Sequence, residues 1–421
     1  MKNKFKGYFP SYKEIIRAKN ILKDIINETP LQKNSLLSEK YKANVFLKRE
    51  DLQIIRSYKI RGAYNKIKSL SHIELKKGII CASAGNHAQG VAYSCNILKI
   101  PGKIYMPSTT PKQKIERVRM FGKEYIEIFL LGDTFDAVSC EAMKDCTKNE
   151  KIFIHPFDDV KIIEGQATVG LEILQQSISD IDYVFIPIGG GGLASGVGSY
   201  FKEFSPKTKI IGVEPQGAPS MSYSLKKGKI VELKTIDRFI DGASVKKVGE
   251  LNFNICHQTL FDIITIPEGK VCTTILDLYN LEAIVAEPAG ALSIAALDFY
   301  SDKIKGKTIV CILSGGNNDI TRTEEIRERS LLYEEKKHYF IVKFPQRAGA
   351  LKEFVNNILG PKDDITYFEY SKKTSKEEGP AVIGIELSDK NEFYGLIGKM
   401  KKHKVHFQYL NKNPDLFRVL I

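Results

Sequence analysis

Tryptophan is absent from the 421 residues, and no pair among the seven cysteines has Cys-x-x-Cys spacing. An odd number of cysteines argues against a disulfide framework, and their spacing argues against a zinc knuckle. The basic N-terminus is not followed by the apolar core of a signal peptide. Free thiols persist in reducing compartments, so we expect a cytoplasmic protein.

The chain also lacks a long apolar run that is free of glycine. Residues 183–201 carry no charge and approach the length of a membrane span, but they contain Pro187 and six glycines. A buried strand, loop and helix explains this stretch, so we expect no membrane partner. The 63 basic residues exceed the 50 acidic ones, but the two kinds are intermingled and form no arginine-rich stripe. We therefore expect no nucleic-acid partner.

Short apolar runs alternate with helical stretches between residues 78 and 313. Runs that are apolar on both faces are typical of parallel strands covered by helices. We therefore predict an α/β domain over residues 1–325, with open, twisted, mostly parallel sheets in two subdomains. Its N-terminal helix is expected over 11–26, where Ser11 and Glu14 form a capping box. The strand candidates are 45–48, 78–82, 103–106, 183–188, 210–213 and 308–313.

The composition changes after Ile320. Residues 321–337 are dense in charge and predict an exposed helix or connector, which we place at 326–337. Strand and helix patterns then alternate in the order βαββαβ, which predicts a ferredoxin-like α+β domain over 338–412. Its strand candidates are 339–344, 365–370, 381–387 and 406–410, and its helix candidates are 349–359 and 391–401.

A run of four glycines, Gly189–Gly192, follows an apolar strand and precedes a helix that begins near Leu193. Glycines let backbone N–H groups approach an anion, and the helix N-terminus adds partial positive charge. The run therefore predicts a phosphate site. An alternative is a dinucleotide fingerprint that ends at Ala194, with Glu214 as the ribose-binding acid. That motif, however, lies deep in the chain rather than at its first strand.

Lys59 lies just before an expected helix, among aromatic and apolar residues. Burial lowers the pKa of a lysine, and its free amine then attacks carbonyl groups. The alternative is an ordinary solvated lysine.

Two other turns follow strands. Residues 83–90 place Asn86 and His87 at a helix entry, which suits carboxylate binding, although a simple N-capped helix explains the same residues. Residues 314–318 lie at the end of a strand, where ligands gather in open α/β sheets, although a plain turn explains them too.

Taken in this order, these motifs resemble those of the biosynthetic threonine dehydratases, which are pyridoxal-phosphate enzymes of the tryptophan-synthase-β-like class with fold type II. The resemblance spans nearly the whole chain. Residues 344–351 are similar to a stretch of the ACT-like regulatory module of the same enzymes. The matching stretches are 48–53, 57–59, 83–87, 189–193 and 314–317.

The resemblance implies pyridoxal 5′-phosphate as cofactor and assigns roles to residues. Lys59 would hold the cofactor as a Schiff base and act as a catalytic residue together with Ser314, which would face the pyridine nitrogen. Asn86 would bind the ring hydroxyl. The phosphate would be bound by Gly189, Gly190, Gly191, Gly192 and Leu193, and the substrate carboxylate by Ser83, Gly85 and His87.

Three features depart from the family pattern. Tyr58 replaces the phenylalanine that many members carry, and only one ACT-like unit is present. Glu214, Ala218 and Ser220 resemble a cation site, but Ser220 stands where an acid is found, so we assign no metal.

The implied reaction is dehydration and deamination of L-threonine to 2-oxobutanoate and ammonia, the first step of isoleucine biosynthesis. The resemblance further implies feedback by isoleucine, with valine as a second candidate, and a homodimer or homotetramer. A serine-preferring or catabolic dehydratase is the nearest alternative. A nicotinamide-dependent oxidoreductase and a non-catalytic amino-acid sensor are the others.

Overall fold

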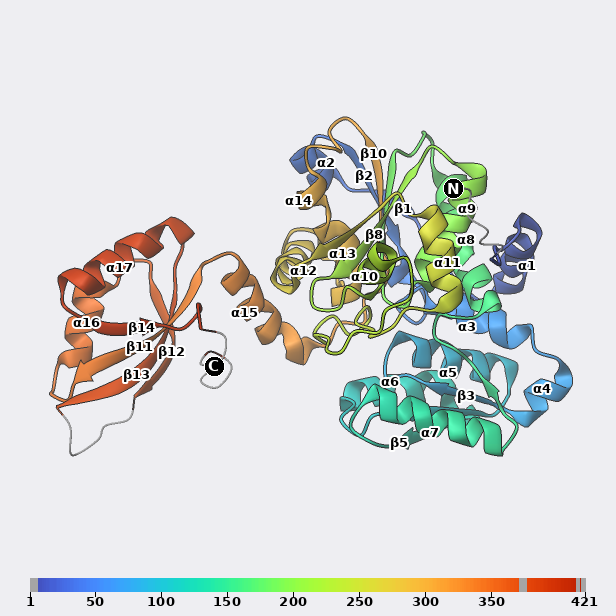
Figure 1. Ribbon diagram of the computed structural model, residues 1–421, viewed down its shortest axis with the longest axis horizontal. Helices are drawn as coiled ribbons and strands as arrows, with labels where there is room; N and C mark the ends of the chain where they lie inside the picture. Colours follow the sequence, from blue (N-terminus) through green and yellow to red (C-terminus); the bar gives the residue numbers. More distant parts are fainter. Residues whose placement is uncertain (1–6, 371–376, 414–416, 418–421) are drawn as a thin grey trace. The chain divides into compact units, whose positions relative to one another are not determined.

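The chain folds into two compact units, of which the first ends at Ile320 and the second begins at Thr321 (Figure 1). The computed structural model describes residues 7–370, 377–413 and 417. None of the helices in this described part is long and apolar enough to cross a membrane.

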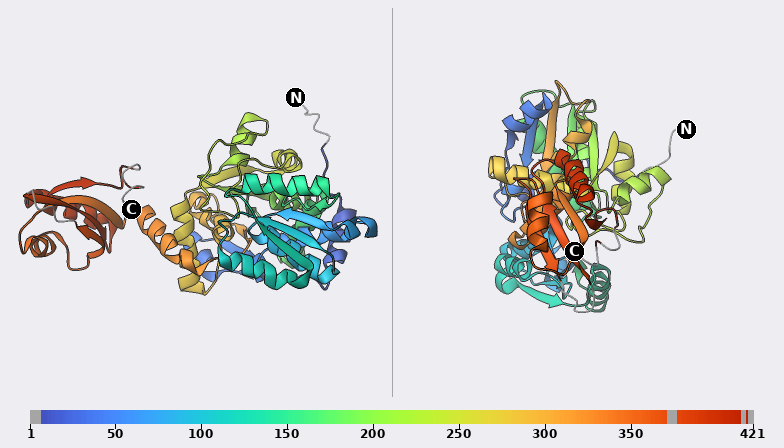
Figure 2. Two further views of the ribbon diagram at one scale, coloured as in Figure 1. Left: turned by 90° about the horizontal axis from the view of Figure 1, so that it is seen from below. Right: turned by 90° about the vertical axis from the view of Figure 1, so that its left-hand side faces the viewer.

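The first unit holds two sheets with helices on both faces (Figures 1 and 2). The larger sheet has six strands, which are parallel except for the antiparallel pair β1 and β2. The smaller sheet has four parallel strands. In spatial order, the strands are β1 (Leu31–Lys33), β2 (Asn44–Arg49), β10 (Thr308–Leu313), β7 (Tyr183–Pro187), β8 (Lys209–Pro215) and β9 (Asp262–Ile266), and then β5 (Ile126–Leu130), β4 (Gly102–Met106), β3 (Ile79–Ala82) and β6 (Ile152–Phe153).

Helices follow most strands and pack back onto the sheets. The α-helices of this unit are α1 (Tyr12–Leu22), α2 (Ser35–Tyr41), α3 (Lys59–Lys68), α4 (His72–Lys77), α5 (Asn86–Leu98), α6 (Lys112–Gly122), α7 (Phe135–Lys148), α8 (Val160–Gln176), α9 (Gly192–Phe204), α10 (Ser220–Lys227), α11 (Glu250–Thr259), α12 (Glu268–Glu282), α13 (Pro288–Ala295) and α14 (Leu297–Tyr300). The short 3-10 helices are η1 (Glu50–Leu52) and η2 (Lys123–Tyr125), with η3 (Ile320–Arg322) at the division between the units.

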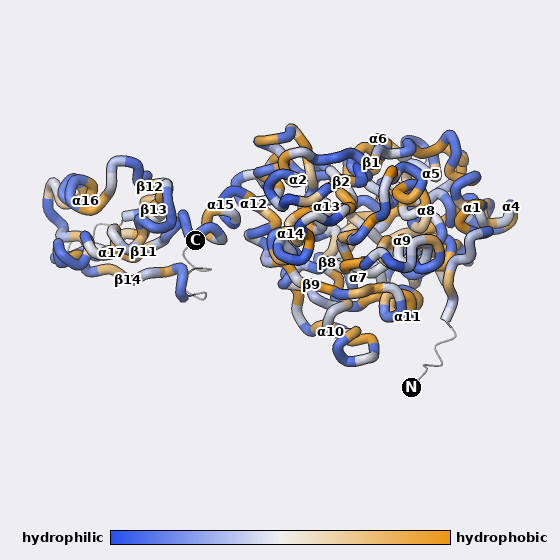
Figure 3. Tube along the Cα trace, turned by 90° about the horizontal axis from the view of Figure 1, so that it is seen from above, coloured by the Kyte–Doolittle hydropathy of each residue, from blue (hydrophilic) through white to orange (hydrophobic). Residues whose placement is uncertain are grey.

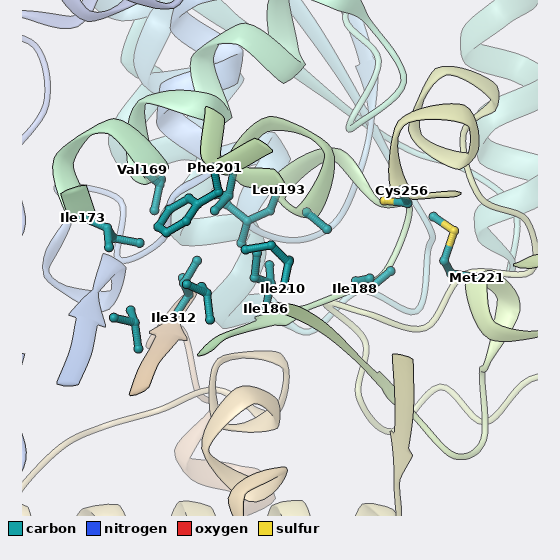
Figure 4. Packing of buried hydrophobic residues seen from close by; sticks show 14 of the residues in the cluster. Val169, Ile173, Ile186, Ile188, Leu193, Phe201, Ile210, Met221, Cys256 and Ile312 are labelled. Atoms are coloured by element: carbon teal, nitrogen blue, oxygen red, sulfur yellow. The ribbon is translucent and has the colours of Figure 1, made fainter. Parts of the chain in front are cut away.

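Alternation along each strand explains why helices lie on both faces. In β3, Ile79 and Cys81 pack with residues of α5, whereas Ile80 and Ala82 pack with residues of α7. The core of the larger sheet is built in the same way on the face covered by α8 and α9. Figure 4 shows side chains from these helices packed around strand side chains, among them Val169, Phe201, Leu193, Ile186 and Ile312.

A buried ion network joins β2, α3 and α8. The guanidinium of Arg61 donates to Glu50 at 2.7 and 2.8 Å and to Glu172 at 2.5 and 2.8 Å. Lys48 donates to the same Glu172 at 2.6 Å. Lys48, Glu50 and Arg61 are 0% exposed, so each buried charge has an opposite charge in contact. This network accounts for Lys48 and Glu50 in the stretch 48–53, where Arg49 and Asp51 form a separate ion pair.

Close approach of two helices brings α3 against α8. A Cβ on Gly165 of α8 would lie 2.6 Å from the carbonyl oxygen of Arg61 and 2.7 Å from the Cα of Gly62. Only glycine leaves room for this crossing, which fixes the direction of α3.

The second unit is a four-stranded antiparallel sheet with the order β12-β13-β11-β14. Helices α16 and α17 pack against this sheet and form the core of the unit with it. Figure 3 shows hydrophilic and hydrophobic residues alternating along α16. The elements are α15 (Thr323–Tyr333), β11 (Lys337–Pro345), α16 (Ala350–Ile358), β12 (Asp364–Tyr370), β13 (Glu378–Glu386), η4 (Lys390–Glu392), α17 (Phe393–Lys402) and β14 (His406–Tyr409).

The predicted α/β fold and the βαββαβ order of the second unit are confirmed, and so is the capping box of Ser11 and Glu14. Helix α15 occupies most of the stretch expected as a helix or connector. Four strands were not identified, namely β1, β5, β6 and β9. All four are edge strands with partly exposed side chains, so they lack the continuous apolar run that marks a central strand. Residues 372–379, between the second and third strand candidates of this unit, are expected to form a loop; only 377–379 are described, and β13 already begins at Glu378.

Replacing Arg61 by methionine should destabilise the first unit strongly. The change removes the cation that is paired with Glu50 and leaves that carboxylate buried without a counter-charge in contact. We expect the free energy of unfolding to fall by about 3–5 kcal/mol, measured by urea denaturation followed by circular dichroism.

The control is Lys144→Ala, which breaks an exposed ion pair with Glu141. Exposed pairs of this kind contribute little, so its unfolding midpoint should match that of the wild type. Equal midpoints for the Arg61 and Lys144 variants would contradict the assigned importance of the network.

Candidate active site

A cavity of about 530 Å³ lies in the first unit. Residues at or just beyond the ends of strands line it, including Ser83 after β3, Pro107 after β4 and Pro187 at the end of β7. Carboxyl ends of parallel strands are where open α/β sheets bind ligands, and the volume suits a small organic molecule.

Three helices begin at this cavity. Lys59 is the first residue of α3, Asn86 is the first of α5 and Gly192 is the first of α9, and all three residues line the cavity. The first N–H groups of a helix lack intrahelical partners and carry partial positive charge. The cavity is therefore suited to an anionic ligand.

The side chain of Lys59 projects into this cavity beside Tyr58. Its Nζ donates to the carbonyl oxygen of Pro156 at 2.8 Å. Burial lowers the pKa of Lys59 to about 8, and the nearby carboxylate of Glu287 opposes that change. Near physiological pH, Lys59 therefore carries a neutral amine in a substantial fraction of the molecules, as a nucleophile or base requires.

The glycine run Gly189–Gly192 lines the same cavity. A Cβ on Gly190 would lie 2.2 Å from the ring of Phe157, and one on Gly189 would lie 3.0 Å from the Cα of Ala243. Gly191 has a φ of +96° and caps α9. Side chains are thus excluded by neighbouring atoms as well as by backbone conformation, and the bare backbone of the run lines the cavity.

Asn86 is held by Glu287, which was not predicted, and by Asn317 of the 314–317 stretch. Its Nδ2 donates to Glu287 at 2.6 Å, and its Oδ1 accepts from Nδ2 of Asn317 at 2.7 Å. Asn317 also accepts from Arg117 of α6. Glu287 precedes α13 and is 7% exposed. Nothing in the sequence near Glu287 distinguishes it from the other acids, because its partners lie far away along the chain.

The residues predicted around the substrate carboxylate do lie together. Ser83, Gly85 and His87 all line the cavity, and the N–H of Gly85 donates to the hydroxyl of Ser83 at 3.2 Å. The Nε2 of His87 donates to the carbonyl oxygen of Ile154 at 2.9 Å. Burial lowers the pKa of His87 to about 3, so its imidazole is neutral. Any contribution of His87 to carboxylate binding is therefore that of an uncharged group.

Ser314 lies at the end of β10, next to Lys59 in space. Its carbonyl oxygen accepts from the N–H of Tyr58 at 3.2 Å, and its hydroxyl donates to the carbonyl oxygen of Ala289 at 3.4 Å. The side chain is buried and is not among the residues that line the cavity. The role predicted for Ser314 therefore stays a prediction.

Glu214 does not reach the cavity. Its two carboxylate oxygens accept from the backbone N–H groups of Met221 and Ser222 at 2.7 and 2.8 Å, at the start of α10. Burial raises the pKa of Glu214 to about 8. In the described part of the chain, no group of three or more His, Cys, Asp or Glu side chains is arranged to hold a metal ion.

Comparison with known protein families identifies the first unit. The family described as pyridoxal-phosphate dependent enzyme matches residues 22–315. The chain belongs to the pyridoxal-phosphate-dependent enzymes. The second unit matches the family described as the C-terminal regulatory domain of threonine dehydratase, over residues 328–420.

Similar proteins of known name show to which group of pyridoxal-phosphate enzymes this chain is related. A biosynthetic L-threonine dehydratase from Halalkalibacterium halodurans is 60% identical over 97% of this chain and 98% of the relative. The protein of the same name from Bacillus subtilis is 56% identical over 97% of each chain. The solved structure of threonine deaminase isoform 2 from Solanum lycopersicum, in its processed form, is 40% identical, with a TM-score of 0.72 over 77% of this chain and 96% of that one. The predicted family is thus confirmed, and the nicotinamide-dependent alternative is wrong.

The residues present fit pyridoxal phosphate, which is the cofactor of this chain. An amine of lowered pKa suits the aldehyde, and the glycine run at the start of α9 suits the phosphate. Three buried polar atoms in the cavity wall have no hydrogen-bond partner among the described residues. They belong to Gln89, Ser244 and Asn318 and are the groups that a polar ligand would satisfy.

In the protein without its cofactor, the reactivity of Lys59 should rise with pH and reach half its maximum near pH 8. Only the neutral amine reacts with trinitrobenzenesulfonate, and burial has lowered the pKa of this side chain to about 8. Labelling over a pH series, followed by mass spectrometry of the peptide that contains Lys59, measures this midpoint.

The exposed Lys68 at the end of the same helix serves as the reference for the reagent. A midpoint for Lys59 above about pH 10, the range of a lysine in water, would show that its amine is solvated rather than buried.

Proposed function

We propose that this chain catalyses the dehydration and deamination of L-threonine to 2-oxobutanoate and ammonia, as the first step of isoleucine biosynthesis. The observation that carries the proposal is that Lys59 and the glycine run Gly189–Gly192 line one cavity, in which burial lowers the pKa of the Lys59 amine. The high identity to proteins named biosynthetic L-threonine dehydratase over nearly the whole chain supports the substrate.

Lys59 would hold the cofactor covalently and, once released by the substrate, take the proton from the substrate Cα. When bound, pyridoxal phosphate supplies an electron sink for the electrons left at Cα. The pKa of about 8 leaves Lys59 able to accept a proton and to return it near neutral pH.

The substrate carboxylate would lie at the N-terminus of α5. The first residues of this helix line the cavity, and Ser83 adds a hydroxyl beside them. Because His87 is neutral, the attraction comes from backbone dipoles rather than from a side-chain cation. Asn86 would bind the ring hydroxyl of the cofactor, and the N–H groups of residues 189–193 would bind its phosphate.

Ser314 would face the pyridine nitrogen. A hydroxyl carries no negative charge, so it stabilises a protonated ring less than a carboxylate does. This chemistry favours loss of the β-hydroxyl over reactions that need a long-lived carbanion.

Replacing Lys59 by alanine should abolish both cofactor absorbance and ammonia release. The variant lacks the only amine proposed to hold the cofactor and to move the Cα proton, so turnover should fall by more than about 100-fold. The two readouts are the visible spectrum of the purified protein and an ammonia assay with L-threonine.

Lys68→Ala on the same helix is the matched control and should behave as the wild type. Parallel assays with L-serine distinguish the serine-preferring alternative. Wild-type turnover by the Lys59 variant would refute the proposal, and threonine binding without ammonia release by the wild type would indicate a sensor instead.

We further propose that the second unit binds isoleucine, with valine as a second candidate, and lowers the activity of the first unit. The match to a regulatory domain supports binding of a small-molecule effector. We place the effector carboxylate at the start of α16, where helix N–H groups lack intrahelical partners. Arg347 lies there, but its guanidinium is already paired with Glu353 at 2.6 and 2.8 Å, so an effector carboxylate has to compete with this pair.

Removing residues 321–421 should leave threonine turnover and abolish the response to isoleucine. The division of the chain into two compact units at this point supports the design. Regulation requires an effector that binds two states of the enzyme with different affinity, and the deletion removes the proposed binding unit. Turnover is measured with increasing isoleucine and, separately, valine.

The full-length protein provides the control for inhibition. Inhibition of the shortened protein at the same isoleucine concentration would place the effector site in the first unit and contradict this assignment.

We also propose that the enzyme works in the cytoplasm as a homodimer or homotetramer. Its seven cysteines are free thiols, as in a reducing compartment. Large apolar side chains are exposed at the end of α12 and just beyond it, where Tyr279 is 60%, Leu281 67% and Val285 49% exposed. Neighbouring apolar groups of this size are typical of an interface between subunits.

A further inference from the structure

We propose that Glu287 is a positioning residue that orients the side-chain amide of Asn86, so that an N–H rather than a C=O faces the cofactor ring. This inference rests on the proposed function, because it takes Asn86 as the group that binds the ring hydroxyl. It adds a carboxylate of the opposite subdomain to the machinery around the cofactor.

The hydrogen bonds of Asn86 can be counted. An asparagine amide has two N–H donors and an oxygen that accepts. One N–H is used by Glu287 at 2.6 Å, and the oxygen accepts from Asn317 at 2.7 Å. One N–H remains for a ligand in the cavity that Asn86 lines.

Turning this amide over would break both bonds. After a flip, the Asn86 oxygen would face the Glu287 carboxylate, and its NH₂ group would face the NH₂ group of Asn317. Neither contact is a hydrogen bond while Glu287 is ionised, since an ionised carboxylate only accepts and the Asn317 nitrogen only donates. Asn317 itself has no alternative, because its other N–H donates to the carbonyl oxygen of Ile55 at 2.8 Å.

The carboxylate of Glu287 is held in place on its far side. Residue Glu287 is 7% exposed and directly precedes α13. Its backbone N–H donates to the carbonyl oxygen of Gly315 at 3.1 Å. A Cβ on Gly315 would lie 2.4 Å from the Glu287 Oε1. Glycine at this position therefore leaves the space that the carboxylate occupies, which gives one glycine of the Ser314–Asn317 motif a definite role.

The charge of Glu287 also acts on the cavity. Burial and the charge of Asp241 raise the pKa of Glu287 to about 7, whereas the hydrogen bond from Asn86 favours the ionised form. The charged form in turn raises the pKa of Lys59. Orientation of Asn86 and charge near Lys59 are thus supplied by one side chain.

A double-mutant cycle on pyridoxal phosphate binding tests the proposal. The proteins are the wild type, Glu287→Gln, Asn86→Ala and the double variant, each freed of cofactor and titrated with pyridoxal phosphate while its absorbance is followed. The Glu287→Gln change keeps the volume of the side chain but replaces a carboxylate oxygen with an NH₂ group, which tolerates the flipped amide. We expect Glu287→Gln to weaken binding about tenfold when Asn86 is present and less than about twofold in the Asn86→Ala background.

Glu268→Gln is the matched control. Glu268 accepts a backbone N–H from Gly217 at 2.7 Å in the same unit but does not line the cavity. Its variant should bind pyridoxal phosphate as the wild type does. Circular dichroism spectra of all variants establish that they are folded, and a purely structural role for Glu287 would lower binding equally in both backgrounds.

The outcomes are distinct. A loss that depends on Asn86 supports the proposal, whereas an equal loss in both backgrounds, or wild-type affinity for Glu287→Gln, overturns it. If Glu287→Gln does not fold, Glu287→Asp keeps the charge but withdraws it from Asn86, and wild-type affinity of that variant overturns the proposal as well. Failure of the wild type to bind pyridoxal phosphate at Lys59 would instead refute the proposed function.

Discussion

The active site depends on the ion pairs that the buried guanidinium of Arg61 makes. The guanidinium binds two carboxylates from different elements, Glu50 beyond β2 and Glu172 on α8, with no exposure to water. Lys59 lies two residues before Arg61 on the same helix, α3. The direction and register of α3 therefore determine where the Lys59 amine lies, and they are set by charge pairing on one side and by the Gly165 crossing on the other. A buried pair of this kind adds little net stability compared with apolar packing, but it specifies one arrangement.

Electrostatics in the cavity follow from this placement. Three helix N-termini converge there and make the site attractive to anions, while burial makes it unfavourable for the cation of Lys59. The same burial leaves His87 neutral and Glu287 partly protonated near neutral pH. A phosphate and a carboxylate can thus be bound largely by backbone groups, which leaves the side chains free for proton transfer and for orienting the ring.

Central elements were predictable because their signals are local. Strands β3, β7 and β10 are buried on both faces, so their sequences are apolar throughout. The edge strands β5 and β9 pair on one side only, and their mixed sequences gave no comparable signal. In the site, Lys59 and the glycine run stand beside strand and helix boundaries that the sequence marks. Glu287 and Arg117 do not, because their partners are about two hundred residues away and come together only through the packing of two sheets.

By itself, the sequence determined the fold class, the central strands of the first unit, the order of elements in the second unit and the family, because periodicity and short motifs are properties of neighbouring residues. The tertiary structure decided which of these residues share one cavity. It also decided that Glu214 accepts hydrogen bonds from the backbone of α10 rather than from a ligand, and that Asn86 is hydrogen-bonded to both Glu287 and Asn317. Burial, pKa and hydrogen-bond pairing depend on distances through space, and these are defined only when the chain has closed on itself.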